Sequence, residues 1–182
     1  SENDYQILQN SATARPTFAI ASELNNQPVI VFNGTNSYLD GGNILNLGTN
    51  SHTFFIISKK TGNSGSFFSK SRAATAEGRY GFIIESGNLS FFYHDNQQRN
   101  VSLNSFSNNN YNLFSILNNR QNQKNQLFVN SNFVKENSLN ADYEFNNTFN
   151  FLIGAYNNSS GGVPPYFALY LNGAIAEIIF YN

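Results

Sequence analysis

Residues 172–182 read NGAIAEIIFYN, and this closing stretch decides the fold class. Asn172-Gly173 is a turn signal, because both residue types enter positive φ at low cost. The run from Ala174 to Tyr181 is apolar at almost every position and rich in residues that favour strands. Alternation along a strand places Ile175, Glu177, Ile179 and Tyr181 on one face, and Ala176, Ile178 and Phe180 on the other. Because both faces are mostly apolar, we expect a central strand rather than an edge strand.

The same alternation of short apolar runs with Asn, Gly and Ser clusters continues through the chain. The predicted strands are 27–32, 52–60, 66–70, 79–85, 88–94, 111–117, 126–130, 132–135, 149–156 and 174–181, with tight turns at 86–87 and 130–131. Only 23–25 and 44–47 are predicted as single helical turns. Strands with one buried face pack as two sheets. The sequence therefore predicts an all-β fold, a two-sheet antiparallel β-sandwich of the jelly-roll type. We expect one domain over residues 1–182, as part of a larger chain.

Composition excludes several classes of function. Charged residues make up 12% of the chain and the net charge is −1. The 10 Lys and Arg residues are scattered, so no basic surface for nucleic acid is expected. No apolar run approaches the roughly 20 residues that a membrane-spanning helix needs, so membrane insertion is not expected. The absence of Cys rules out disulfides and thiolate metal sites.

Four segments resemble one known family in the order in which they occur. They are residues 14–18 with 24–39 (ARPTF, then LNNQPVIVFNGTNSYL), 52–60 (HTFFIISKK), 127–132 (LFVNSN), and 152–154 with 171–182 (LIG, then LNGAIAEIIFYN). They are similar to the concanavalin A-like lectin/glucanase superfamily, specifically to bacterial laminin-G-like domains. The resemblance implies a concanavalin A-like jelly roll in a secreted, cell-surface or virion-surface protein.

Some relatives in this superfamily hold calcium, and the resemblance implies where such a site would lie. The chain departs from the pattern there, with Asn33, Asn36, Ser37 and Ala174 at positions that are often acidic in the family. Asp40 and Glu177 are the acids nearest to these positions and are the candidate ligands for Ca²⁺, which prefers several oxygen donors. For Glu177 we favour another role, a hydrogen bond to backbone that pins the two chain ends, because buried charge must be paired.

The acidic residues give little support to an enzyme. Glucanases of the superfamily alternate acids on one strand, and a retaining mechanism needs two carboxyl groups about 5 Å apart. Asp142 and Glu144 are the single acidic pair at this spacing, and they lie in a polar stretch that reads as a solvated loop. We therefore expect no enzyme activity. A polysaccharide-degrading enzyme, such as a lyase around Tyr80, Tyr93 and His94, is a minor alternative.

The leading hypothesis is a non-catalytic, lectin-like module that binds a glycan or polysaccharide. Sugars are bound by aromatic faces, and by amides and Arg that fix the hydroxyl groups. The candidate residues gather near predicted strand ends; they are Tyr93, His94, Asp95, Asn96, Arg99, Asn118, Arg120, Tyr156, Asn157 and Tyr166. Each of them is also compatible with an ordinary solvated loop. Tyr80, Phe82 and Phe92 are predicted to lie in the core.

The competing hypothesis is a structural or adhesion module of a bacterial surface protein or a phage appendage. A domain of that kind would bind a protein partner, or neighbouring domains of its parent protein. It predicts a large apolar patch or an open strand edge on the surface.

Overall fold

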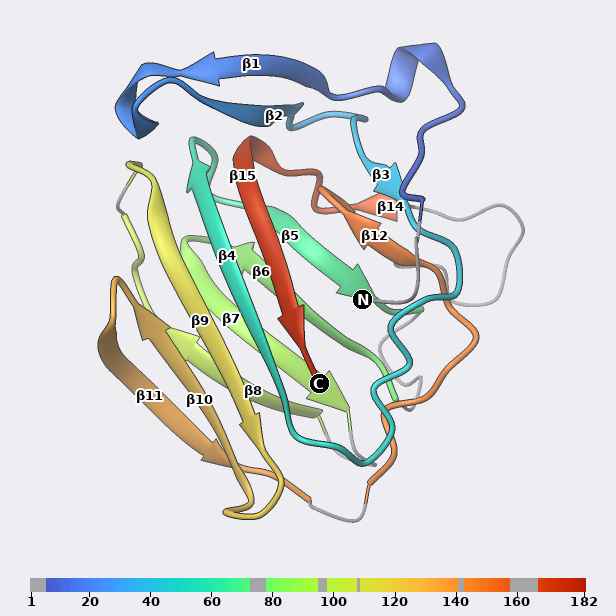
Figure 1. Cartoon of the computed structure of the whole chain (residues 1–182), viewed down its shortest axis with the longest axis vertical. Coiled ribbons are helices and arrows are strands. Elements are labelled where there is room, and N and C mark those ends of the chain that lie inside the picture. The colour runs from blue at the N-terminus through green and yellow to red at the C-terminus, as the bar shows by residue number, and fades with distance from the viewer. Residues whose placement is uncertain (1–5, 73–77, 95–97, 108, 141–142, 158–166) are drawn as a thin grey trace.

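A computed structural model describes residues 6–72, 78–94, 98–107, 109–140, 143–157 and 167–182, excepting the side chains of residues 98 and 167. It confirms the predicted fold class, because two antiparallel sheets pack face to face (Figure 1). The larger sheet contains, in spatial order, β1 (Thr17–Ala21), β2 (Gln27–Asn33), β15 (Asn172–Tyr181), β4 (His52–Lys60), β9 (Asn112–Asn119), β10 (Lys124–Val129) and β11 (Asn132–Ser138).

The smaller sheet contains β3 (Leu39–Asp40), β12 (Phe151–Ile153), β5 (Gly65–Lys70), β6 (Tyr80–Glu85), β7 (Asn88–His94) and β8 (Gln98–Leu103), in spatial order. Two short strands, β13 (Tyr156–Asn157) and β14 (Phe167–Ala168), pair with each other in a separate two-stranded sheet. Two turns of 3-10 helix, Ala12–Ala14 and Ser22–Leu24, complete the described elements. None of the described helical segments has the length and apolar character that a bilayer crossing requires.

Most predicted strands are present, with ends that differ by a few residues. The run 149–156 is divided at Gly154, whose φ is +82° and whose missing side chain leaves room for the ring of Phe32. The predicted helical turn at 23–25 overlaps the 3-10 turn Ser22–Leu24, whereas 44–47 is not helical. β1 and β8 were not predicted, because TFAIA is short and QRNVSL is mostly polar.

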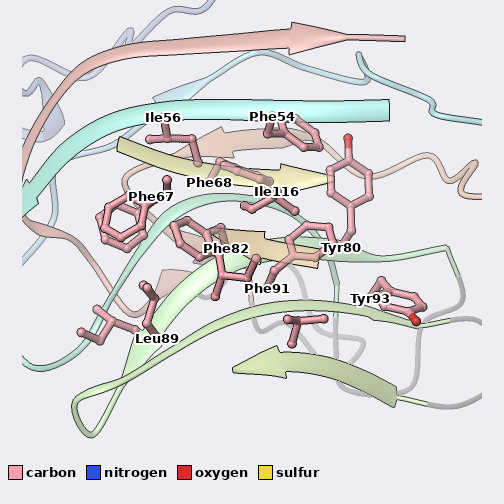
Figure 2. Close-up of a cluster of buried hydrophobic side chains, with 14 of the residues drawn as sticks. Phe54, Ile56, Phe67, Phe68, Tyr80, Phe82, Leu89, Phe91, Tyr93 and Ile116 are labelled. Atoms are coloured by element: carbon pink, nitrogen blue, oxygen red, sulfur yellow. The ribbon is translucent and has the colours of Figure 1, made fainter. Parts of the chain in front are cut away.

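Aromatic rings from both sheets fill the space between them. Phe54 of β4 stacks on Phe68 of β5 with ring centroids 4.6 Å apart, and both side chains are fully buried. Figure 2 shows this pair among the rings of Tyr80, Phe82 and Phe91. Each such ring contributes roughly 1.5–3 kcal/mol by leaving water. The predicted core positions Tyr80 and Phe82 are confirmed.

The closing strand β15 is central at its first half, as predicted, but its two faces differ from the simple alternation. Ile175 pairs with Ser58 and Glu177 pairs with Ile57, so Ala176 is an extra residue that forms a β-bulge. The bulge turns Ile175, Ile178 and Phe180 toward the core, and it turns Glu177 outward. The predicted grouping of Ile175 with Glu177 is therefore wrong.

Candidate functional site

The outer face of the smaller sheet carries a polar groove. Along β7 the side chains of Leu89, Phe91 and Tyr93 point into the core, so Asn88, Ser90 and Phe92 point outward. Asn100 and Ser102 of β8 lie opposite Phe92 and Ser90 on the same face. These side chains line a groove of about 660 Å³. The rest of the lining comes from Arg79, Ile83, Glu85, Ser86, Asn104, Tyr156, Ala168 and Leu169.

Neutral polar groups form the middle of the groove. The hydroxyl groups of Ser90 and Ser102 lie 2.7 Å apart across the β7–β8 ladder. The side-chain oxygen of Asn88 accepts a hydrogen bond of 3.1 Å from the backbone N–H of Ser105, and the Asn100 side chain is exposed. Hydroxyl and amide groups donate and accept at once. This surface can therefore match a ligand that carries many hydroxyl groups.

One end of the groove is closed by a cation and two aromatic rings. Arg79 and Phe92 are each 3% exposed, and the guanidinium carbon of Arg79 lies 5.3 Å from the centre of the Phe92 ring. The Nη1 group of Arg79 donates a hydrogen bond of 2.9 Å to the hydroxyl of Tyr156. The rings of Phe92 and Tyr156 meet edge to face at 5.7 Å. These contacts hold the three side chains in one arrangement.

The segment that carries Tyr156 is tied to the neighbouring strand β5. The N–H of Gly154 donates to the carbonyl oxygen of Phe67 over 3.1 Å, and the hydroxyl of Ser69 donates to the carbonyl oxygen of Ala155 over 3.0 Å. The N–H of Leu171 closes the other side by donating to the carbonyl oxygen of Gly154 over 2.9 Å. Tyr156 therefore stands at the groove on an anchored segment of the chain.

Several residues predicted to contact sugar are buried elsewhere. Tyr93 is fully buried, and its hydroxyl donates to the carbonyl oxygen of Ser138, so its ring offers no face to a ligand. Asn118 is 2% exposed and donates to the side-chain oxygen of Asn125 over 2.9 Å. Arg120 packs over the ring of Phe145 at 4.6 Å and donates to the carbonyl oxygens of Asn140 and Gly48. Tyr93, Asn118 and Arg120 do not line the groove, and their contact with a glycan stays a prediction.

The remaining predicted residues lie near the groove or outside the described chain. Tyr156 lines the groove, and the half-buried Asn157 follows it in β13. His94 is half-buried at the end of β7, and Arg99 is half-buried and donates to the hydroxyl of Ser138 over 3.3 Å. Asp95, Asn96 and Tyr166 lie outside the described residues.

Most residues that line the groove were not predicted from the sequence. Arg79 was not considered as a site residue, and neither were Ser90, Asn100 and Ser102. Phe92 is buried, as predicted, but it lies on the outer face against Arg79 and outside the main core cluster. The outward positions of 88–92 and 100–102 read as Asn, Ser and Phe, then Asn and Ser. Apart from Phe92 these outward residues are polar, and polar residues at every second position were the sequence signal for the groove.

The proposed calcium ligands do not form a site. Both carboxylate oxygens of Asp40 are engaged, one by the N–H of Gly42 at 2.8 Å and the other by the side-chain amide of Asn150 at 2.9 Å. Glu177 is exposed, so it does not pin the chain ends from a buried position. Within the described residues no three His, Asp or Glu side chains come together as a metal site would require. The residues present therefore do not fit Ca²⁺ at this place.

Comparisons with known proteins place the fold. No family model matches the sequence, and no curated protein matches it. The NanB sialidase of Streptococcus pneumoniae has a TM-score of 0.65 at 16% identity, over 83% of this chain and 25% of that one. The CBM40 of the Ruminococcus gnavus IT-sialidase, bound to α2,3-sialyllactose, has a TM-score of 0.59 at 14% identity, over 72% of this chain and 75% of that one. Domains LG4-5 of the mouse laminin α1 chain have a TM-score of 0.60 at 12% identity, over 82% and 40% of the two chains.

These likenesses concern the fold of the chain. The chain has the concanavalin A-like jelly-roll fold that carbohydrate-binding and laminin G domains share, which confirms the resemblance seen in its sequence. At these identities the likeness concerns the fold alone. The chain spans about a quarter of the length of the NanB sialidase chain.

Proposed function

We propose that this domain is a non-catalytic carbohydrate-binding module, and that the glycan lies in the groove on the outer face of the smaller sheet. The groove supports this proposal by its composition. It joins a row of neutral hydroxyl and amide groups to an end built from Arg79, Phe92 and Tyr156. Its volume of about 660 Å³ is large enough for a short oligosaccharide.

The lack of a second acid in the groove supports a binding role over a catalytic one. Glu85 is the one carboxylate among the described residues that line it. Glycoside hydrolysis uses a pair of carboxyl groups on opposite sides of the scissile bond. Glu144, from the acidic pair noted in the sequence, accepts a hydrogen bond from the side chain of Asn146, and Asp142 lies outside the described residues.

The neighbours in fold space support a role outside the cell. CBM40 modules are non-catalytic, and two of the matched CBM40 structures are bound to sialyllactose. By analogy of fold, we infer that this domain belongs to a secreted or cell-surface protein and that it brings that protein to a glycan. The match to one quarter of the NanB chain supports a module attached to further domains.

A glycan array followed by calorimetry tests the proposal. The array should contain sialylated and neutral oligosaccharides, and the strongest ligand is then measured against Asn100→Ala. The matched control is Asn132→Ala, an exposed Asn→Ala change on β11 of the other sheet. We expect Asn100→Ala to weaken binding about threefold to tenfold, with Asn132→Ala unchanged. An array without any ligand, or equal loss in both variants, contradicts the proposal.

A further inference from the structure

Among the described residues, no strand pairs with the second half of the closing strand β15 on the side away from β4, so its edge is open there. It pairs with β2 over Asn172–Ile175 only, whereas it pairs with β4 along almost its whole length. Figure 1 shows β2 crossing near the start of β15, and it does not run beside the second half of that strand. From 176 to 181 the described residues supply no backbone partner on the side away from β4. An open edge presents unpaired N–H and C=O groups to any strand that can approach.

An apolar pocket lies beside this open edge. It has a volume of about 330 Å³ and is lined mainly by hydrophobic side chains from both sheets and from the segment between β3 and β4, among them Ile30, Phe32, Ile44, Phe151, Ile178 and Phe180. Ile178 and Phe180 come from the open half of β15 and are only partly buried, although they pack on the core. Apolar side chains from an incoming strand would complete their burial.

The edge and the pocket together make the two parts of a strand-addition site. In such sites the backbone edge supplies the hydrogen bonds, and pockets receive every second side chain of the bound segment. We propose that residues 176–181 of β15 bind an extended segment of a partner protein, which pairs with this edge and places alternate apolar side chains in the pocket.

Charge defines the partner further. The bulge at Ala176 turns Glu177 outward, and Glu177 is the one charged side chain among the described residues that line the pocket. It is exposed, and no ion pair or hydrogen bond of its side chain is present among the described residues. A strand beside β15 brings one residue directly opposite Glu177. The partner segment therefore carries Lys or Arg at that position, with apolar residues at alternate positions facing the pocket.

The chain's own first residues match this description poorly. Ile7 lines the pocket, and residues 1–5, which lie outside the described part of the chain, precede it closely in the sequence. Their sequence, SENDY, has two acids and a single large apolar residue. Acidic side chains repel Glu177, and one apolar residue does not supply an alternating set. A basic, alternating segment from another protein fits better.

A pair of synthetic peptides tests the site on the whole chain. One peptide of about seven residues alternates Val with Lys, and its control alternates Val with Glu. Binding is followed by NMR, together with the hydrogen exchange of the backbone amides in 176–181. We expect the Lys peptide to bind and to slow the exchange of the amides that point away from β4. The Glu peptide binds more weakly by about twofold to fivefold or more.

Charge reversal of the protein provides the matched variant. Glu177→Lys changes an exposed side chain, so we expect the fold to be retained. The variant should reverse the protein's preference between the two peptides, so that the Glu peptide binds better than the Lys peptide. Two results overturn the proposal. One is a failure of the peptide assay, in which neither peptide binds at about 1 mM or both bind without regard to Glu177. The other is that the edge amides of the free chain are already protected, because the chain itself then fills the site. Neither result depends on the glycan groove.

Discussion

Arg79 and Tyr156 lie 77 positions apart in the chain, yet the guanidinium group of Arg79 donates a hydrogen bond of 2.9 Å to the Tyr156 hydroxyl. The contact joins the start of β6 to the anchored segment that follows Gly154. It fixes a cation and an aromatic ring at the end of a row of hydroxyl and amide groups. The proposed glycan site rests on this arrangement.

Removal of the Tyr156 hydroxyl tests the contact without loss of the ring. In Tyr156→Phe, Arg79 loses the hydrogen bond to this hydroxyl while the edge-to-face packing on Phe92 remains. We expect glycan affinity to fall about threefold to tenfold, and the melting temperature to fall as well, because the guanidinium group that loses this acceptor is almost fully buried. Calorimetry and thermal unfolding measure the two effects. Unchanged affinity would show that the contact has no part in binding.

Gly81 lies beneath the ring of Phe92 and leaves room for it. A Cβ atom added to Gly81 would lie 2.8 Å from the Phe92 ring and 2.9 Å from the carbonyl oxygen of Phe68. Gly81→Ala must therefore displace the ring toward the groove, which costs about 1–3 kcal/mol of folding stability. We expect a lower melting temperature and weaker glycan binding together. If stability falls while the affinity for glycan stays the same, the position of Phe92 has no part in glycan binding.

The sequence was sufficient for the layers of the fold but not for this site. The run 52–60 and the turns at 86–87 and 130–131 show their structure locally, because apolar alternation and turn residues act over a few positions. The face of β15 on which the Glu177 side chain lies could not be predicted, because the extra residue Ala176 reverses the alternation of inward and outward side chains. Arg79, Phe92 and Tyr156 come from separate segments, and only the paired strands bring them together. The polar stretches around Tyr93 and Asn118 attracted attention by composition, but the side chains of Tyr93, Asn118 and Arg120 are buried and engaged in packing or hydrogen bonds.

The buried imidazole of His52 gives the protein a defined acid sensitivity. Burial among Phe54, Phe145 and Phe180 lowers the pKa of His52 from 6.5 to about 4. Between these values the unfolded chain takes up a proton that the folded chain refuses, so stability falls as the pH falls from 6.5 to 4. The loss amounts to roughly 3 kcal/mol.

The variant His52→Phe should remove this acid step, because no proton is then bound at this position in either state. Urea unfolding at several pH values between 4 and 7 measures the difference between the two proteins. We expect the stability of His52→Phe relative to the parent to rise as the pH falls. Parallel curves for the parent and the variant would contradict the role of His52.

Lys70 makes the stability of the protein depend on pH in the alkaline range. Its ammonium group is buried and donates to the side-chain oxygen of Asn43 at 2.7 Å and to the carbonyl oxygen of Phe149 at 2.8 Å. Desolvation lowers the pKa of Lys70 from 10.5 to about 8. The folded state therefore disfavours the charged form, and this penalty is present below pH 8 and is relieved as the pH rises toward 10.5.

We expect the parent protein to gain stability relative to Lys70→Met as the pH is raised from 8 to 9.5. The comparison with the variant matters, because tyrosines of the unfolded chain begin to ionise near the upper end of this range. Chemical unfolding of both proteins at each pH gives the difference directly. A constant difference would show that Lys70 keeps its proton throughout.

The central claim is that a glycan binds on the sheet face rather than at the strand-end loops. Backbone NMR of the whole chain, titrated with the strongest ligand from the glycan array, tests it most directly. The account predicts that the largest shift changes fall at Ser90, Phe92, Asn100 and Ser102, with Tyr156 at the end of the groove. Changes confined to the end of β9 around Asn118 and Arg120, or the absence of any change at saturating glycan, would contradict it.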